Sequence, residues 1–155
     1  MPILPVSQLF VALENNWLRE AEIEVKLVRF QNGPAMVQAL LAGQLDVAHF
    51  GIGPAMVARA KGADIKVVAA SGKEQISFLA LGELAPYFKS DSSKAFAKFR
   101  ADKGRKAVVT TFPVGSVPQT VLQYWLLKKL RANPDDLQII YQGSAQVQQS
   151  LATGA

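Results

Sequence analysis

The sequence predicts an α/β fold built from alternating helices and strands. Along residues 1–70 the predicted order is helix, strand, helix, strand, helix, strand. Such alternation is typical of mostly parallel strands covered by helices. The chain has 155 residues, of which 50% are hydrophobic. This is enough apolar material for the core of one domain or of two small lobes.

The stretch that organises the first half of the chain runs from residue 35 to residue 57. It predicts a helix that ends at Gly43 in a left-handed cap, a short strand over 45–50, and a second helix with Pro54 in its first turn. A strand that ends in glycines before a helix leaves backbone N–H groups free, and these can hold an anion. The turn at 51–53 is therefore a candidate binding site.

Four further elements are predicted around this stretch. Ser7 is placed to cap a helix that runs from Gln8 to about Asn15. Apolar and polar residues alternate over 22–30, which predicts a strand with one buried face. The apolar runs over 65–70 and 76–81 predict buried strands.

The second half predicts a simpler alternation. Residues 83–106 are polar and charged, which indicates a solvated surface connection with a short helix near 94–100. After it we expect a strand, a strongly apolar helix that opens at Gly115-Ser116, a second strand and a last helix. The ranges are 107–111 and 137–141 for the strands, and 145–151 for the last helix.

A weak internal repeat indicates two similar lobes. The six residues Gln38–Gly43 resemble Gln149–Gly154, and each run closes a predicted helix. We therefore expect a partial lobe I over 1–82, a surface connection or crossover over 83–106 and a partial lobe II over 107–155.

Composition excludes several classes of function. The net charge is +5 and the pI is near 9.6, but the basic residues are scattered and no nucleic-acid-binding motif accompanies them. A mildly basic surface that attracts small anions is the better explanation. Without cysteine there is no disulfide, thiol nucleophile or thiolate metal site. No apolar run is long enough for direct membrane insertion, and no metal or cofactor site is predicted.

Several motifs resemble the solute-binding proteins of ABC importers for nitrate, sulfonates, taurine and related compounds. They are Leu9–Glu14, Ala42–Ala48, Gly51–Pro54, Phe112–Ser116 and Trp125–Leu127. The resemblance implies a periplasmic-binding-protein-like (type II) architecture, in which two lobes hold the ligand in the cleft between them. It also implies a non-enzymatic protein that binds a small anionic solute and works with a membrane permease. The intact protein would be periplasmic, or extracellular and membrane-associated.

The resemblance further implies that ligand is held by loops at the carboxyl ends of strands. In lobe I these loops comprise Ser7, Gln8, Gly51, Ile52, Gly53, Ser71 and Gly72. In lobe II they comprise Thr110, Thr111, Gly115, Ser116, Val117, Gln142 and the adjacent Gly143. Among them we expect four hydrogen-bond donors, which are the Ser7 and Ser116 hydroxyls and the Gly53 and Val117 amides.

Two differences from the family accompany this interpretation. Family members usually carry an export signal and a first strand before the position of Ile3, and they continue beyond Ala155. We therefore expect a chain truncated at both ends.

Two alternative functions remain open. One alternative is an enzyme that handles a thiamine pyrimidine precursor, with His49 or Lys73 as the reactive group. The other is the effector-binding domain of a transcription regulator, which would require a helix-turn-helix segment upstream. We expect His49 to be packed or to line the cleft.

Overall fold

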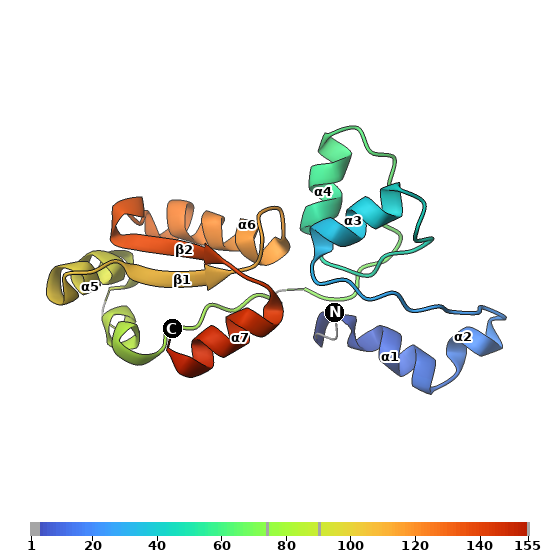
Figure 1. The fold of residues 1–155 in the computed structure, drawn as a ribbon, viewed down its shortest axis with the longest axis horizontal. Coiled ribbons are helices and arrows are strands. Elements are labelled where there is room, and N and C mark those ends of the chain that lie inside the picture. The colour runs from blue at the N-terminus through green and yellow to red at the C-terminus, as the bar shows by residue number, and fades with distance from the viewer. Residues whose placement is uncertain (1–3, 74, 90, 155) are drawn as a thin grey trace. The chain divides into compact units, whose positions relative to one another are not determined.

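The computed structural model describes residues 4–73, 75–89 and 91–154 of a mixed α/β chain, mostly helical with a small parallel sheet. The chain divides into two compact units, Met1–Gln75 and Ile76–Ala155 (Figure 1). Among the described residues, no helix is both long enough and apolar enough to cross a membrane. The α/β class predicted from the sequence is confirmed, and the two-lobe type II architecture stays a prediction.

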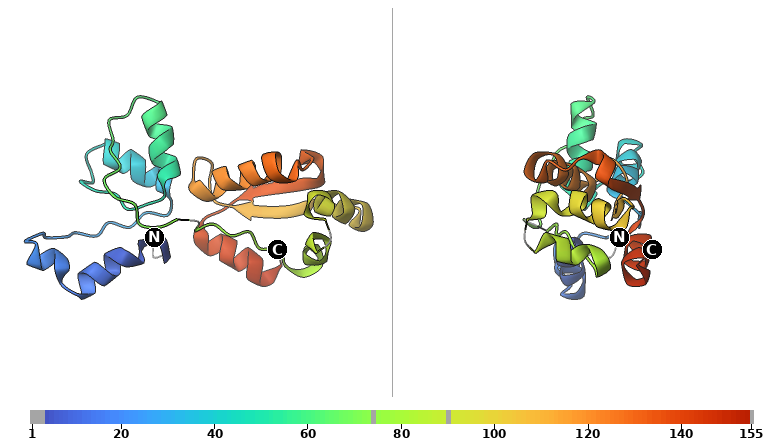
Figure 2. Two further views of the ribbon diagram at one scale, coloured as in Figure 1. Left: turned by 180° about the vertical axis from the view of Figure 1, so that it is seen from behind. Right: turned by 90° about the vertical axis from the view of Figure 1, so that its left-hand side faces the viewer.

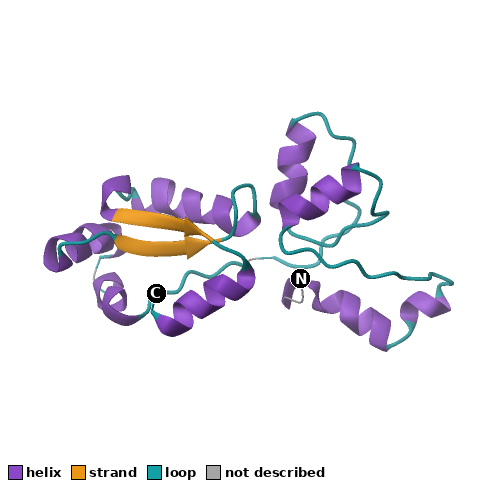
Figure 3. Cartoon of the chain, viewed as in Figure 1, coloured by secondary structure: helices purple, strands orange, loops and turns teal. Residues whose placement is uncertain are grey.

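The first unit is built from short helices joined by long loops (Figure 3). Its elements are the 3-10 helix η1 (Leu4–Val6), α1 (Ser7–Glu14), α2 (Trp17–Glu20), α3 (Gly33–Leu41) and α4 (Ile52–Ala60). The prediction that Ser7 caps the first helix is wrong. Ser7 is the first residue of α1, and the cap position belongs to Val6, because the η1 turn already directs the chain into the helix.

The strands predicted over 22–30, 45–50, 65–70 and 76–81 are absent from the structure. These segments run as loops, and the described residues contain one sheet of two strands, neither of which comes from them. The apolar pattern that predicted buried strands is real, but none of its side chains is fully buried and several stay in solvent: Val68, for example, is 86% exposed. A strand requires a neighbouring backbone about 4.8 Å away with which to exchange hydrogen bonds, and these segments have no such neighbour here.

The first unit is held together where α3 meets α4. Met36 and Val37 of α3 and Ala58 of α4 are buried. Gly33, at the start of α3, lies so close to Pro54 of α4 that a Cβ on it would come within 2.8 Å of the proline ring. A larger residue at position 33 would therefore push the two helices apart.

Two other helix ends in this unit, the end of α3 and the start of α4, follow the sequence prediction. Gly43 lies just beyond α3 with φ of +70°, which confirms the predicted left-handed cap. Pro54 occupies the first turn of α4, as expected from its fixed φ and missing N–H.

The second unit is a parallel strand pair wrapped by helices. Strands β1 (Ala107–Thr111) and β2 (Leu137–Tyr141) pair in register from Ala107 with Leu137 to Thr111 with Tyr141. Both were predicted at these bounds. The other elements are η2 (Gly82–Phe88), η3 (Ser92–Lys94), α5 (Ala95–Lys103), α6 (Val117–Tyr124), the π-helix η4 (Trp125–Leu130), η5 (Pro134–Asp136) and α7 (Ser144–Thr153).

The crossover from β1 through α6 and η4 to β2 is a βαβ connection, the arrangement that parallel strands require. Helices α6 and α7 flank the strand pair (Figures 1 and 2). The core is an apolar cluster that combines α5, both strands and the helix of the crossover. Its buried members are Phe96, Phe99, Ala107, Leu122, Leu126, Leu130 and Leu137.

The expectation that 83–106 is a solvated surface connection is wrong at α5. Phe96 is 4% exposed and Phe99 is 2% exposed, and both belong to the core cluster. The buried residues of α5 recur at helical spacing, so one narrow apolar stripe faces the core while lysine and arginine occupy the outer face. Because residues 83–106 are polar on average, this apolar stripe was not predicted from the sequence. The predicted lobe boundaries themselves remain a prediction.

Candidate functional site

The carboxyl ends of β1 and β2 bring three of the predicted site residues together. The Gln142 backbone N–H donates to the Thr111 carbonyl at 2.8 Å, which extends the strand pairing by one step. The Thr110 hydroxyl donates to Gln142 Oε1, also at 2.8 Å. Thr111 is buried, whereas Thr110 and Gln142 are half-buried. Polar side chains therefore gather at the edge of the sheet where open α/β folds bind ligands.

The start of α6 follows β1 and contains three more predicted residues. Ser116 is the N-cap of this helix, and its Oγ accepts from the Gln119 backbone N–H at 3.4 Å. The Gly115 N–H donates to Gln119 Oε1 at 3.1 Å, and the Ser116 N–H donates to the Pro113 carbonyl at 3.1 Å. Gly115 has φ of +86°, a conformation that favours glycine.

Most of the hydrogen-bond donors at this helix end already have a partner. The N–H groups of Gly115, Ser116 and Gln119 are already bonded, and Pro118 has none. The Val117 N–H has no partner among the described residues. The Ser116 Oγ uses a lone pair to accept, so its own proton remains available. Two donors are thus left, the Val117 amide and the Ser116 hydroxyl, and both belong to the predicted set of four donors.

Sequence reasoning missed Gln119 and Ser150. Gln119 is 4% exposed and fastens the Gly115-Ser116 turn to the helix. Serine at the N-cap and glutamine three residues later form a capping-box pattern, so this role was visible in the sequence. Ser150 lies on α7, and its hydroxyl donates to Gln142 Oε1 at 3.0 Å. No local pattern pointed to Ser150, because the contact depends on how α7 folds back beside the strands.

In the first unit, the predicted residues form two groups. Gln8 Nε2 donates to the Ser71 carbonyl at 2.6 Å, which joins the start of α1 to the loop that contains Gly72. Ser7 lies beside Gln8, in the first turn of α1. No hydrogen bond between described residues joins this group to the residues that open α4.

The second group lies at the N-terminus of α4. Gly51 is the N-cap and provides no side-chain cap, while Ile52 and Gly53 are the first two helical residues. The N–H groups of Ile52 and Gly53 have no partner among the described residues, and Pro54 has no N–H at all. Two backbone donors therefore remain available at this helix end.

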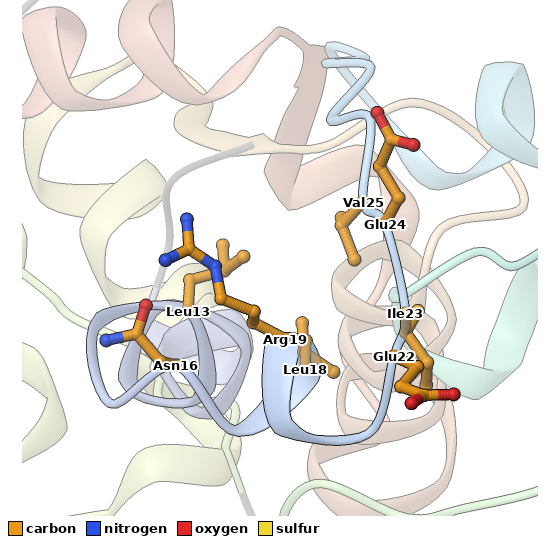
Figure 4. Close-up of a pocket in the computed structure, with 8 residues that line it drawn as sticks. All are labelled: Leu13, Asn16, Leu18, Arg19, Glu22, Ile23, Glu24 and Val25. Atoms are coloured by element: carbon orange, nitrogen blue, oxygen red, sulfur yellow. The ribbon is translucent and has the colours of Figure 1, made fainter.

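Two open hollows in the first unit differ from the predicted site. One, of about 430 Å³, lies between the α1–α2 hairpin and the loop that follows (Figure 4). Its lining residues are Leu13, Asn16, Leu18, Arg19, Glu22, Ile23, Glu24 and Val25, none of which was predicted. The other, of about 600 Å³, lies beside α4 and includes one predicted residue, Ile52. In Figure 4 the Glu22 and Glu24 carboxylates point away from the first hollow.

The two reactive groups considered from the sequence both lie on loops. His49 is half-buried on a loop and Lys73 is exposed. Within residues 4–73, 75–89 and 91–154, no three His, Asp or Glu side chains lie together in a way that could hold a metal ion.

The comparison with known proteins decides the family. The model of the NMT1-like family matches residues 1–155. The chain belongs to the NMT1-like family. A Bacillus subtilis (strain 168) protein that carries the provisional name of aliphatic sulfonates-binding protein is 36% identical over 70 residues. The match covers 43% of this chain and 21% of that protein. No solved structure matches the chain.

These findings confirm the resemblance to solute-binding proteins of nitrate and sulfonate importers. The family and the relative's name point to a binding protein and not to an enzyme. This chain spans about a fifth of the relative, since the match covers 21% of that protein.

Proposed function

We propose that the chain is part of the substrate-binding component of an ABC importer and captures a small oxyanion-bearing solute, such as a sulfonate, taurine or nitrate. The observation that carries the proposal is the pair of available donors at the start of α6, the Ser116 hydroxyl and the Val117 amide. Family membership supports the binding role. As part of an importer, the component would work in the periplasm or outside the cell and deliver its solute to a membrane permease.

The chemistry of this helix end suits an oxyanion. Anion oxygens accept hydrogen bonds and do not donate them, which matches a site whose available groups are donors. The positive end of the helix dipole adds about 0.3–1 kcal/mol in favour of a negative charge, and each hydrogen bond to a charged group adds about 1.5–3 kcal/mol. Gln119 holds the Gly115-Ser116 turn in place before ligand arrives, so little ordering is required on binding.

The start of α4 is proposed as the binding edge of the first unit. The N–H groups of Ile52 and Gly53 are available there in the same way as that of Val117. Gln8 and Ser71 are joined by a hydrogen bond, and with Ser7 and Gly72 they are proposed as a second polar group of this unit.

The proposal is tested by thermal unfolding of the chain with millimolar taurine, ethanesulfonate, nitrate, sulfate or bicarbonate. A ligand that binds only the folded state at 100 times its Kd stabilises that state by about 2.7 kcal/mol, so the transition should move upward with concentration. We expect a rise with at least one of these anions and none with chloride. Transitions that none of them moves would contradict anion binding by this chain.

The site assignment is tested with Ser116→Ala, which should weaken binding of the active anion by about 1 kcal/mol or more. Because Ser116 is also the N-cap, the alanine variant loses helix stability, and affinity must be measured by calorimetry on folded protein. Ser116→Gly removes the same hydroxyl at a capping cost of only a few tenths of a kcal/mol, and should weaken binding equally. Ser92→Ala, at an exposed serine, is the matched control. Wild-type affinity in both Ser116 variants would remove Ser116 from the site.

A further inference from the structure

Two hydroxyl groups from different elements meet at one atom of Gln142. Thr110 Oγ1, on β1, donates to Gln142 Oε1 at 2.8 Å. Ser150 Oγ, on α7, donates to the same oxygen at 3.0 Å. A carboxamide oxygen has two lone pairs, so these two bonds fill its capacity to accept. The side chain of Gln142 is therefore fixed through its oxygen.

The backbone of Gln142 is fixed as well, since its N–H donates to the Thr111 carbonyl at 2.8 Å. What remains of the side chain is the NH₂ group, which carries two N–H donors. No hydrogen bond from this nitrogen to another described residue is present. The side chain is half-buried at the end of β2, where a donor without a partner would gain from meeting an acceptor.

We propose that Thr110 and Ser150 are positioning residues that orient the Gln142 amide, so that its NH₂ group is offered to a ligand at the carboxyl edge of β1 and β2. The inference rests on the proposed function and extends it by assigning a polarity to the bound group. An atom that only accepts hydrogen bonds, such as a sulfonate or nitrate oxygen, fits this position, and an ammonium, which only donates, does not. Taurine carries both groups, and its sulfonate end would meet Gln142.

The opposite orientation of the amide is the competing arrangement. If the amide were turned over, its NH₂ would donate to the two hydroxyl oxygens and its oxygen would face outward. The site would then favour a ligand that donates. The two arrangements differ in whether the NH₂ protons are engaged, which can be measured without any ligand.

Nuclear magnetic resonance of the ¹⁵N-labelled full chain makes this measurement. The Gln142 side-chain signal is identified by its loss in Gln142→Met. We expect its NH₂ protons to exchange with water as fast as those of the exposed Gln123 and Gln149. Exchange slower by about tenfold or more, relieved in Ser150→Ala, would show the NH₂ bonded to the hydroxyls and would overturn the proposal.

Calorimetry with ethanesulfonate tests the consequence for binding. Ser150→Ala and Thr110→Val each remove one orienting hydroxyl, and each should weaken binding about three- to tenfold. Ser150→Thr keeps the hydroxyl and should restore affinity, which a purely structural loss would not predict. Thr153→Ala is the matched control on the same helix, because Thr153 donates to the Gln149 carbonyl and not to Gln142.

The outcomes separate the two proposals. If the wild-type chain binds ethanesulfonate and both hydroxyl variants bind it equally well, the positioning role is wrong and the proposed function stands. If the wild-type chain binds none of the oxyanions, the proposed function fails, and the ligand polarity assigned here fails with it. The exchange rates still decide in that case whether the two hydroxyls hold the amide oxygen.

Discussion

At the residue scale, Glu83 shows how the surface of the second unit uses its charge. Its carboxylate lies 3.2 Å from Lys103 Nζ and 3.1 Å from Arg105 Nη2. The hydrogen bond from Lys103 is the main reason why the pKa of Glu83 lies below its ordinary value of 4.5, and Arg105 lowers this pKa further. All three side chains are exposed, so the pairs are screened by salt and add little to overall stability.

The pH dependence of Glu83 follows from the direction of this shift. A carboxyl group whose pKa is lower in the folded chain favours folding above its unfolded pKa, and this contribution is lost as the pH falls through the folded value. We expect carbon-detected titration to place the pKa of Glu83 below 4.5, and Lys103→Gln to raise it more than Arg105→Gln does. Lys128→Gln, at an exposed lysine on η4, is the control. An unchanged pKa in both the Lys103 and Arg105 variants would mean that these contacts do not persist in solution.

At the element scale, α5 is the clearest case of a segment whose role depends on a few positions. Phe99 is 2% exposed and packs edge-on against Tyr87, with ring centroids 5.5 Å apart. The Arg105 guanidinium lies 4.9 Å from the centre of the same ring. One aromatic side chain therefore links η2, α5 and the turn that leads into β1.

Phe99→Ala should destabilise the second unit by about 3–5 kcal/mol, because it removes a large side chain from a packed core. Urea unfolding followed by the fluorescence of Trp125, which lies against this core, measures the loss. Lys98→Ala, on the exposed face of the same helix, should change stability by less than about 0.5 kcal/mol. Equal stability in the two variants would contradict a core role for α5.

At the scale of the whole molecule, the two units differ in strand pairing and in the burial of their apolar side chains. The second unit contains the paired strands β1 and β2 and an apolar cluster. The loops of the first unit contain apolar residues that stay in solvent, such as Val47, Val67 and Val68. Sequence patterns typical of buried strands therefore remain without paired neighbours in the described chain.

Hydrogen exchange should reveal this difference directly. We expect the backbone amides of the paired strands, 107–111 and 137–141, to be protected from exchange. The amides of 24–30 and 66–70 form no backbone hydrogen bonds among the described residues, so we expect them to exchange nearly as fast as those of an unfolded chain. Amides within α3 serve as an internal reference for helical protection in the first unit. Protection of 66–70 equal to that of β1 would mean that this segment is paired in solution.

The amino-acid sequence alone was sufficient for features that depend on neighbouring residues. The bounds of β1 and β2, the opening of α6 at Gly115-Ser116 and the left-handed cap at Gly43 were all predicted, since each depends on local backbone preference. The family was also readable from short motifs. Of the candidate site, the start of α6 and the end of β1 were placed correctly in the chain for the same reason.

Only the tertiary structure decided which groups meet across the chain. It showed that 65–70 lacks a pairing partner and that Phe99 is buried. It also showed that Gln119 uses the Gly115 amide and that Ser150 reaches Gln142. Strand pairing, burial and the contact between Ser150 and Gln142 depend on segments distant in sequence, whose approach no local preference specifies. Whether a predicted donor remains available to a ligand depends on such contacts.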